Sequence, residues 1–451
     1  MSLSKLLYNG RDDDHVVALR ANDDQVTWRE FYNDILCIRD RLNLASGFKT
    51  GILACEDTYY FMVAFLAMVS SEIEIVIGAN LQEDTLKLLR KKTGGHVICD
   101  DFISQGLKKD VPKIDLRDLS NSCDIQSVLI TLYTSGSTGE PKAITKSISA
   151  LEAEIAMFHD KWGNKFSDKL FLSSVVHYHA YGLPFHILWS LCSGAVCGLE
   201  RILYPETLMR YKKYQVNFIS SPAFLNQFAQ IYDTQENYDF LKFISAAGAP
   251  LDHAVSKKIS SRIHDPIVEI YGSTETGAIA FKTYHDDAVW QRFSSVNLDV
   301  SEDGIVSVLA PHIGQNTPYA LEDKIDLISN EQFRLLGRAD RVVKIFENRV
   351  SLNNMEQVCG QSSLVLQSKI TPLPDTQRLG CVVILTMEGK EILEKHGKNA
   401  LIQAIKLYLR SGYNLVVLPR KWRFVEAFPY NEMGKIQTHL LQNLFLEKEP
   451  Q

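Results

Sequence analysis

The sequence predicts an α/β fold in which a large N-terminal domain is followed by a small C-terminal domain. Short apolar strands alternate with helical segments over roughly the first 280 residues, turn-rich strands follow, and the last hundred residues mix strands with helices. Such alternation is typical of parallel sheets covered by helices. A chain of 451 residues is also too long for one ordinary compact core. We expect a large domain over 1–339, with parallel-rich sheets and a β-rich subdomain, and a small α+β domain over 340–451.

Composition narrows the function classes. Hydrophobic residues make up 45% and charged residues 23%, as in ordinary soluble proteins. The net charge of -6 argues against a nucleic-acid partner. The N-terminal residues lack the apolar core of a signal peptide, and Glu72 and Glu74 interrupt the most apolar stretch. Eight cysteines without a CxxC pair favour reduced thiols over disulfides or zinc. We therefore expect a cytoplasmic protein with no membrane span.

The alternation can be followed along the chain. Residues 51–79, 82–93 and 96–100 predict strand, helix, strand, helix, strand, and further apolar strands end near residues 220, 246 and 273. Hairpins are expected after residue 280. The small domain should contain a strand at 379–387, a helix at 399–410 and a last helix near the end. Because ligands of open α/β sheets bind beyond the carboxyl ends of the strands, the loops that follow these strands are the candidate sites.

The first unusual loop is SGSTGEPK, which follows the apolar strand that begins at Val128. Its hydroxyls and glycines suit a polyphosphate, and Lys142 adds a positive charge at its end. The spacing is not that of a Walker A loop, which disfavours an ordinary P-loop kinase or GTPase. A plain surface turn remains the alternative. The candidate phosphate-binding residues are Thr134, Ser135, Gly136, Ser137, Thr138 and Gly139.

The second unusual loop is YGSTETG, which follows another buried strand. Tyr271 could stack on a purine, and Glu275 could bind Mg²⁺, which prefers oxygen ligands shared with substrate phosphates. A solvated glutamate in a turn is the alternative for Glu275. The candidate nucleotide-binding residues here are Tyr271, Gly272, Ser273 and Thr274.

Together the two loops resemble those of the adenylate-forming superfamily, which contains acyl-CoA synthetases, nonribosomal-peptide adenylation domains and beetle luciferases. The resemblance covers most of the chain and implies the superfamily's fold, with a mobile C-terminal domain. It implies ATP and Mg²⁺ as cofactors, with Glu275 and Thr138 at the metal, and a carboxylic acid as substrate. The chain is shorter than most members, and the stretch between Ala280 and Asp326 is abbreviated.

Five further segments match the superfamily in the expected order. In HYHAYGLPFH, the resemblance implies that His179 lies near the phosphates and the acyl carboxylate, with Tyr181 and Gly182 at the acyl pocket. A metal site made of His177 and His179, or a buried core histidine, are the alternatives. The implied acyl pocket also includes Ala246, Gly277 and Ala278.

The other segments imply nucleotide and hinge residues. ISAAGAPL resembles the adenine loop, at Ala247, Gly248 and Ala249, although Ala247 replaces a usual glycine. EDKIDLI resembles an incomplete Thr-Gly-Asp segment and leaves Asp326 for the ribose hydroxyls. In LLGRADR, Arg338 would bind ribose or phosphate and Asp340 would be the hinge.

The last segment, PYNEMGKIQ, resembles the motif whose lysine enters the active site, here Lys435. The implied catalytic residues are Lys435, His179 and Lys142. A cation at Lys435 could stabilise the charge that develops as a carboxylate attacks the α-phosphorus of ATP. Coenzyme A or the phosphopantetheine of a separate acyl carrier protein would then accept the acyl group.

Two departures concern this second half-reaction. Glu347 and Asn353 stand where the superfamily has glycines that line the approach of the thiol. A carrier-loading enzyme that ignores coenzyme A, and a degenerate nucleotide-binding regulator or scaffold, therefore remain alternatives; a luciferase-like oxidation has no signature of its own. The expected acyl pocket contains no dedicated charged residue that could bind a second carboxylate or an amino group of the acid. An aromatic or fatty acid is expected, with a slight preference for aromatic acids from Tyr178, Tyr181 and Phe185.

Overall fold

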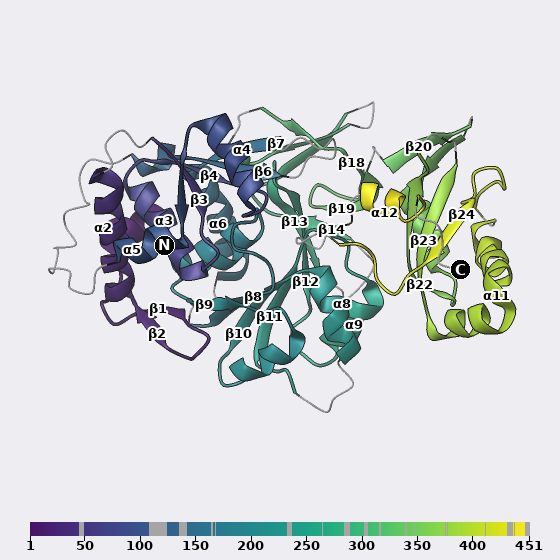
Figure 1. Cartoon of the computed structure of the whole chain (residues 1–451), viewed down its shortest axis with the longest axis horizontal. Helices are drawn as coiled ribbons and strands as arrows, with labels where there is room; N and C mark the ends of the chain where they lie inside the picture. The colour runs from purple at the N-terminus through teal and green to yellow at the C-terminus, as the bar shows by residue number, and fades with distance from the viewer. Residues whose placement is uncertain are drawn as a thin grey trace. The chain divides into compact units, whose positions relative to one another are not determined.

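The computed structural model forms two compact units (Figure 1). The first unit contains Met1–Leu298, Val308–Tyr319 and Ser329–Gln332, and the second contains Asp299–Ser307, Ala320–Ile328 and Phe333–Gln451. The domain boundary expected between residues 339 and 340 stays a prediction. The residues described are 1–44, 49–107, 124–134, 142–163, 166, 168–231, 237–263, 265–283, 289–301, 305–314, 317–338, 341–346, 348–374, 376, 378–410, 412–430, 436 and 438–446.

One sheet of the first unit has the strand order β5-β3-β4-β6-β7 among the described residues. β3, β4, β5 and β6 run parallel, and β7 is antiparallel to β6. The expected strand, helix, strand, helix, strand series from residue 51 onward is confirmed. The elements are β3 (Thr50–Ala54), α3 (Thr58–Ser70), β4 (Glu74–Ile77), α4 (Glu83–Thr93), β5 (His96–Cys99), α5 (Asp100–Gly106), β6 (Leu129–Thr134) and β7 (Lys142–Ser147).

Helix α3 shows how sequence determines position in this part of the fold. Its residues are apolar around the whole circumference, and nearly all are buried. A helix without a polar face can only be stable inside the protein. The side chain of Asp57 caps its N-terminus by accepting a hydrogen bond from the Tyr60 backbone N–H at 2.9 Å.

The second sheet of the first unit has the order β14-β13-β12-β11-β10-β8-β9-β1-β2. Its central strands are parallel, whereas β13 runs antiparallel to β12. The strands are β1 (Val16–Leu19), β2 (Gln25–Thr27), β8 (Leu170–Ser173), β9 (Val196–Arg201), β10 (Val216–Ser220), β11 (Leu241–Ala246), β12 (Val268–Ser273), β13 (Gly277–Thr283) and β14 (Trp290–Arg292).

Helices bury both faces of this sheet, as parallel strands require. On one face, residues such as Phe218 and Ile244 pack in a core that includes residues of α8 and α9. On the other face, an aromatic cluster around Trp189 includes Phe171 and Phe243, whose rings lie 5.5 and 6.3 Å from Trp189. The helical segments are α1 (Leu3–Asn9), α2 (Trp28–Leu44), η2 (Ile125–Ser127), α6 (Ile148–Trp162), η4 (Leu183–Leu188), α7 (Trp189–Ser193), η5 (Pro205–Tyr211), α8 (Pro222–Ile231), α9 (His253–Ser260) and η6 (Pro311–Ile313).

The chain after residue 280 forms short strands, as expected. β15 (Asn297–Val300), β16 (Val306–Leu309) and β17 (Tyr319–Ala320) make one small sheet, and β18 (Asp323–Leu327) pairs with β19 (Gln332–Arg338) as an antiparallel hairpin. The second unit continues with β20 (Val342–Ile345), β21 (Asn348–Ser351), α10 (Leu352–Gly360), β22 (Val365–Pro372), β23 (Leu379–Leu385), α11 (Met387–Leu409), β24 (Lys421–Phe424) and α12 (Thr438–Asn443). The expected strand at 379–387 corresponds to β23, and the expected helix at 399–410 forms the second half of α11, which bends at Gly397.

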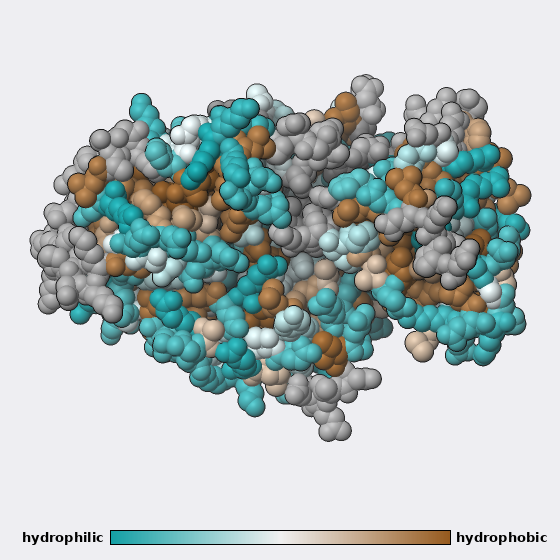
Figure 2. Space-filling view, viewed as in Figure 1, coloured by the Kyte–Doolittle hydropathy of each residue, from teal (hydrophilic) through white to brown (hydrophobic). Residues whose placement is uncertain are grey.

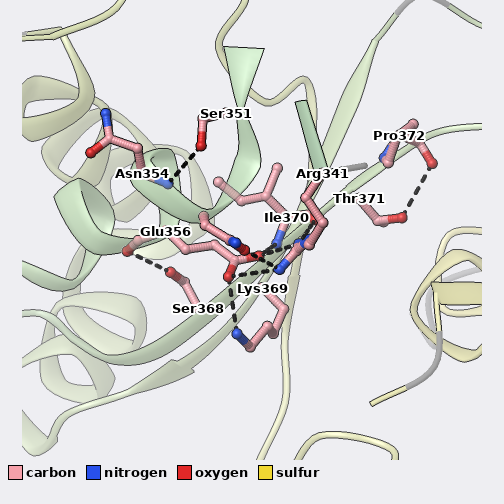
Figure 3. A network of polar contacts seen from close by, with 10 residues as sticks. Arg341, Ser351, Asn354, Glu356, Ser368, Lys369, Ile370, Thr371 and Pro372 are labelled. Carbon is pink, nitrogen blue, oxygen red and sulfur yellow. Dashed lines mark hydrogen bonds and ion pairs between the residues drawn. The ribbon is translucent and has the colours of Figure 1, made fainter. Parts of the chain in front are cut away.

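A network of polar contacts around Glu356 ties the second unit together (Figure 3). Glu356 lies on α10, and its carboxylate accepts hydrogen bonds from Arg341 Nη2 at 2.7 Å, Lys369 Nζ at 2.9 Å and the Ile370 backbone N–H at 2.7 Å. Arg341 also donates to the Ile370 carbonyl and to Asn353 Oδ1. A nearly buried carboxylate with this many donors joins α10 to β22 and to the segment that precedes β20.

The surface is mixed in character. The face in Figure 2 is mostly hydrophilic, with hydrophobic areas on both units. Within the described ranges, no helix combines the length and the apolar composition needed to cross a bilayer.

We predict that Glu356→Ala destabilises the second unit by about 3 kcal/mol, because it leaves Arg341 and Lys369 without their shared carboxylate. Amide hydrogen exchange of α10 and β22 measures the effect directly. Glu426→Ala is the control, since Glu426 is exposed and forms a surface ion pair with Lys390. Equal protection of α10 and β22 in the two variants would contradict this role of Glu356.

Candidate active site

The first unusual loop connects two antiparallel strands. Thr134 ends β6 and lies opposite Lys142, the first residue of β7, with Thr134 Oγ1 3.5 Å from the Lys142 carbonyl oxygen. The predicted phosphate-binding residues Ser135, Gly136, Ser137, Thr138 and Gly139 lie outside the described residues. The hairpin nevertheless defines where their loop begins and ends: both ends are at the β7 edge of the five-stranded sheet.

Lys142 brings the two unusual loops together. Its Nζ lies 2.7 Å from Glu275 Oε1, although the residues are 133 positions apart. Burial opposes ionisation of Glu275, but hydrogen bonds from Lys142 and from the Glu275 backbone N–H outweigh it, so the pKa of this carboxyl is lowered. The Glu275 side chain is 22% exposed. An ionised, partly accessible carboxylate suits a magnesium ion.

The loop that carries Glu275 is a tight turn between β12 and β13. Ser273 N–H donates to Thr276 Oγ1 at 3.1 Å, and Thr276 N–H donates back to Ser273 Oγ at 3.3 Å. A Cβ on Gly272 would lie 2.1 Å from the Gly277 carbonyl oxygen, so only glycine is possible there. These contacts hold Thr274 and Glu275 at the tip of the turn, and the Tyr271 ring lies 5.4 Å from Trp290.

The expected adenine loop follows β11 directly. Gly248 has a φ of +93°, in the left-handed region that glycine tolerates best. Ala247 does not have a positive φ, which explains why an alanine can replace a glycine at this position. Ala249 and Ala247 are half-buried, and Gly248 is exposed. The loop begins at the carboxyl end of a parallel strand, as expected for a ligand site.

The two histidines have different environments. His177 is buried, and Nε2 donates to the Cys55 carbonyl at 3.0 Å while Nδ1 lies 3.1 Å from Thr58 Oγ1. Because both nitrogens are occupied, His177 is a core histidine and cannot share a metal with His179. His179 is half-buried, and its Nδ1 accepts a hydrogen bond from the Tyr181 backbone N–H at 3.4 Å. The described residues contain no cluster of three metal-binding side chains.

Tyr181, which is expected at the acyl pocket, contacts the end of β11. Its hydroxyl lies 2.6 Å from Ser245 Oγ, next to the predicted pocket residue Ala246. Ser245 is fully buried and was not among the residues expected from the motifs. Gly182 follows, and a Cβ there would lie 2.1 Å from the Val176 carbonyl oxygen, so a glycine is required by packing alone.

The β18–β19 hairpin adds a residue to the ribose candidates. Its register places Asp323 opposite Arg338, whereas Asp326 lies opposite Arg334. Asp326 is exposed, with Oδ2 4.0 Å from Arg334 Nη1. Counting back from Arg338 through a tight hairpin would have identified Asp323 from sequence. The side chain of Arg338 is not described, and Asp340, Glu347 and Lys435 lie outside the described residues.

The fold and the order of these loops are those of the adenylate-forming superfamily. A family model described as AMP-binding enzyme matches residues 9–305, more than half of the chain. The chain belongs to the AMP-binding enzyme family. This confirms the resemblance deduced from the motifs, the predicted α/β fold and the expected class of enzyme.

Individual relatives are distant. The chain is 22% identical over 374 residues to the acetyl-coenzyme A synthetase of Pasteurella multocida (strain Pm70), a match that covers 70% of this chain and only 56% of that protein. It is 22% identical over 470 residues to the D-alanine--D-alanyl carrier protein ligase of Staphylococcus aureus (strain JH9), covering 93% and 94% of the two chains. The benzoate CoA ligase of Burkholderia xenovorans LB400 has a similar fold, with a TM-score of 0.79 at 15% identity over 98% of this chain and 100% of that one.

We predict that protonation of His177 contributes to acid unfolding. Burial lowers the pKa of His177 from 6.5 to about 4, so the unfolded chain binds a proton more readily than the folded one. The contribution of the neutral His177 side chain to the free energy of unfolding is complete above pH 6.5 and is lost as the pH falls towards 4. Urea unfolding at several pH values from about 4.5 to about 7.5 measures how the free energy of unfolding changes with pH. This change should be smaller in His177→Gln. An unchanged slope in that variant would assign the effect to other groups.

Proposed function

We propose that this protein activates a carboxylic acid with ATP, forming an acyl-adenylate and pyrophosphate, and then transfers the acyl group to a phosphopantetheine thiol. The observation that carries the proposal is the contact between Lys142 and Glu275, which joins the phosphate loop to the metal loop. Family membership supports the first half-reaction. The match to a coenzyme A synthetase and to a carrier protein ligase supports a thiol acceptor without choosing between the two.

In this proposal, the residues of the first unit bind and orient ATP. Glu275 supplies a carboxylate to Mg²⁺, and Lys142 exchanges its bond with Glu275 for one with a phosphate oxygen as the nucleotide arrives. Tyr271 and the backbone of Ala247–Ala249 contact the adenine. The bound Mg²⁺ would neutralise charge on the transferring phosphate oxygens. Ser135–Gly139 complete the phosphate site, and Thr138 also contacts the metal.

Two further parts of the proposal concern the second unit. Asp323 is our preferred ribose ligand together with Arg338, and Asp326 is the second choice, because the register puts Asp323 across from Arg338. Lys435 supplies the cation that stabilises the attack of the carboxylate on the α-phosphorus. A small domain over 340–451 would turn about Asp340 between the half-reactions.

Asn353 bears on the identity of the acceptor. Asn353 replaces a glycine expected along the approach of the thiol, and its Oδ1 accepts a hydrogen bond from Arg341 at 2.6 Å. This contact holds the side chain within the network of the second unit. This position of Asn353 excludes neither coenzyme A nor a carrier protein as the acceptor. An assay that offers both acceptors distinguishes the two.

We predict pyrophosphate release that depends on ATP, Mg²⁺ and one class of acid, with hydroxylamine trapping the activated acyl group. Lys435→Ala should lower the rate by at least about a hundredfold, because it removes the charge that stabilises the transition state. Arg420→Ala, a substitution of an exposed cation in the same half of the chain, is the control. ATP binding without acid-dependent release for aromatic, short-chain or long-chain acids would favour a degenerate nucleotide-binding protein instead.

We also predict that Tyr181 limits the size of the acid. The Tyr181 hydroxyl bonded to Ser245 closes one side of the proposed pocket, so Tyr181→Ala should shift the preference towards larger acids by about tenfold in kcat/KM. The KM for ATP should stay unchanged. Tyr204→Ala, which removes an exposed tyrosine, serves as the control. An equal loss of activity with all acids would show that Tyr181 supports the fold and does not select the substrate.

A further inference from the structure

Three buried ionisable side chains lie together beside the turn that carries Glu275. Glu154 on α6 is 3% exposed, Lys146 on β7 is 5% exposed and His312 on η6 is 1% exposed. β7 and α6 follow one another in the sequence, whereas η6 comes about 150 residues later, and no motif assigned these residues a role. A buried carboxylate and a buried ammonium are costly unless each has compensating partners. Their presence in the core therefore requires an explanation.

Glu154 is bonded directly to the backbone of the turn. Its Oε1 accepts a hydrogen bond from the Ala278 N–H at 2.8 Å. Gly277 has a φ of +69°, and a Cβ there would lie 2.5 Å from Glu154 Oε1 and 3.0 Å from His312 Cδ2. The carboxylate and the imidazole thus press against the backbone only two or three residues after Glu275. Any change in Glu154 is transmitted to this turn.

Lys146 places a positive charge on the same side of the turn. Its Nζ donates to the His312 carbonyl oxygen at 3.4 Å. Burial lowers the pKa of Lys146, and the negative charges of Glu154 and Glu275 counteract that effect. Residues 142 and 146 lie on the same face of β7, because side chains alternate along a strand. One strand therefore directs two lysines towards the turn. Lys142 contacts the Glu275 carboxylate, and Lys146 lies on the side of the turn that faces the protein interior.

We propose that Glu154 is a positioning residue for nucleotide binding: with Lys146 as its buried counter-charge, it fixes the Gly277–Ala278 backbone and thereby holds Glu275 where it binds the magnesium ion of Mg·ATP. The proposal rests on the proposed function, which gives Glu275 that ligand. It differs from a purely structural role in one respect. The effect of Glu154 must pass through Glu275, so it must depend on Mg²⁺.

Calorimetric titration with ATP, in the absence of any acid, tests this without relying on turnover. Glu154→Leu leaves the Ala278 N–H without its acceptor, and we expect about tenfold weaker binding of Mg·ATP. Binding of ATP in the presence of a chelator should change by less than about twofold, because Glu275 then has no metal to hold. Glu154→Gln keeps an oxygen acceptor and should restore part of the Mg·ATP affinity.

Glu152→Leu is the matched control. Glu152 lies two residues earlier on α6 and accepts hydrogen bonds from the Ser4 N–H at 2.7 Å and the Ser4 hydroxyl at 2.6 Å, away from the turn. Its Mg·ATP affinity should equal that of the wild type. If Glu154→Leu fails to fold because the buried Lys146 loses the nearby negative charge of Glu154, Lys146→Met/Glu154→Leu replaces both buried charges by apolar groups and should recover stability. This double variant should still bind Mg·ATP weakly.

The outcomes are separable. Equal weakening of ATP binding with and without Mg²⁺ would overturn the positioning role and leave a structural one. Wild-type Mg·ATP affinity in either the single or the double variant would also overturn it, while the proposed function stands. A wild-type protein that binds no Mg·ATP would refute the proposed function itself, and this inference with it.

Discussion

The contact between Lys142 and Glu275 is the interaction on which the candidate site depends. The two residues belong to different sheets of the first unit, and each lies at the end of a hairpin that extends a parallel sheet. A bond of 2.7 Å between oppositely charged groups fixes the separation of the two loops before any ligand arrives. Because Lys142 is 53% exposed, this bond contributes little to folding. Its importance is geometric: it keeps a cation and a carboxylate beside one another where a metal and a phosphate would need them.

Antiparallel hairpins fix the ends of both loops. β7 and β13 each turn back on a parallel strand, so both ends of the intervening loop are bonded across the hairpin. In the β12–β13 turn, the reciprocal bonds between Ser273 and Thr276 and the close packing of Gly272 against Gly277 leave few alternative backbone conformations. Such preorganisation reduces the entropy that ligand binding would otherwise cost. The loop expected to contact adenine is not part of such a hairpin and relies on the left-handed conformation at Gly248.

The sequence predicted the parts that depend on local pattern. Alternating apolar strands and helices identified the α/β fold, and the two loops led to the family. It did not identify residues whose role depends on pairing between distant segments. Ser245 emerges only from its contact with Tyr181 and Glu154 only from its bond to the Ala278 N–H, whereas Asp323, opposite Arg338, could have been found by counting back through the hairpin. His177 illustrates the reverse case: its spacing from His179 suggested a possible metal pair, but burial beside Thr58 makes it part of the core.

The network around Glu356 limits where the chain near Arg341 can rotate. Arg341 is the first described residue after 339–340, and its guanidinium is bonded to α10 and to the β22 backbone. A rotation that began after Arg341 would break these buried, charge-assisted bonds, whereas one that began before it would break none of them. The network therefore ties Arg341 to α10 and β22, and these segments move together in any motion that leaves its bonds intact.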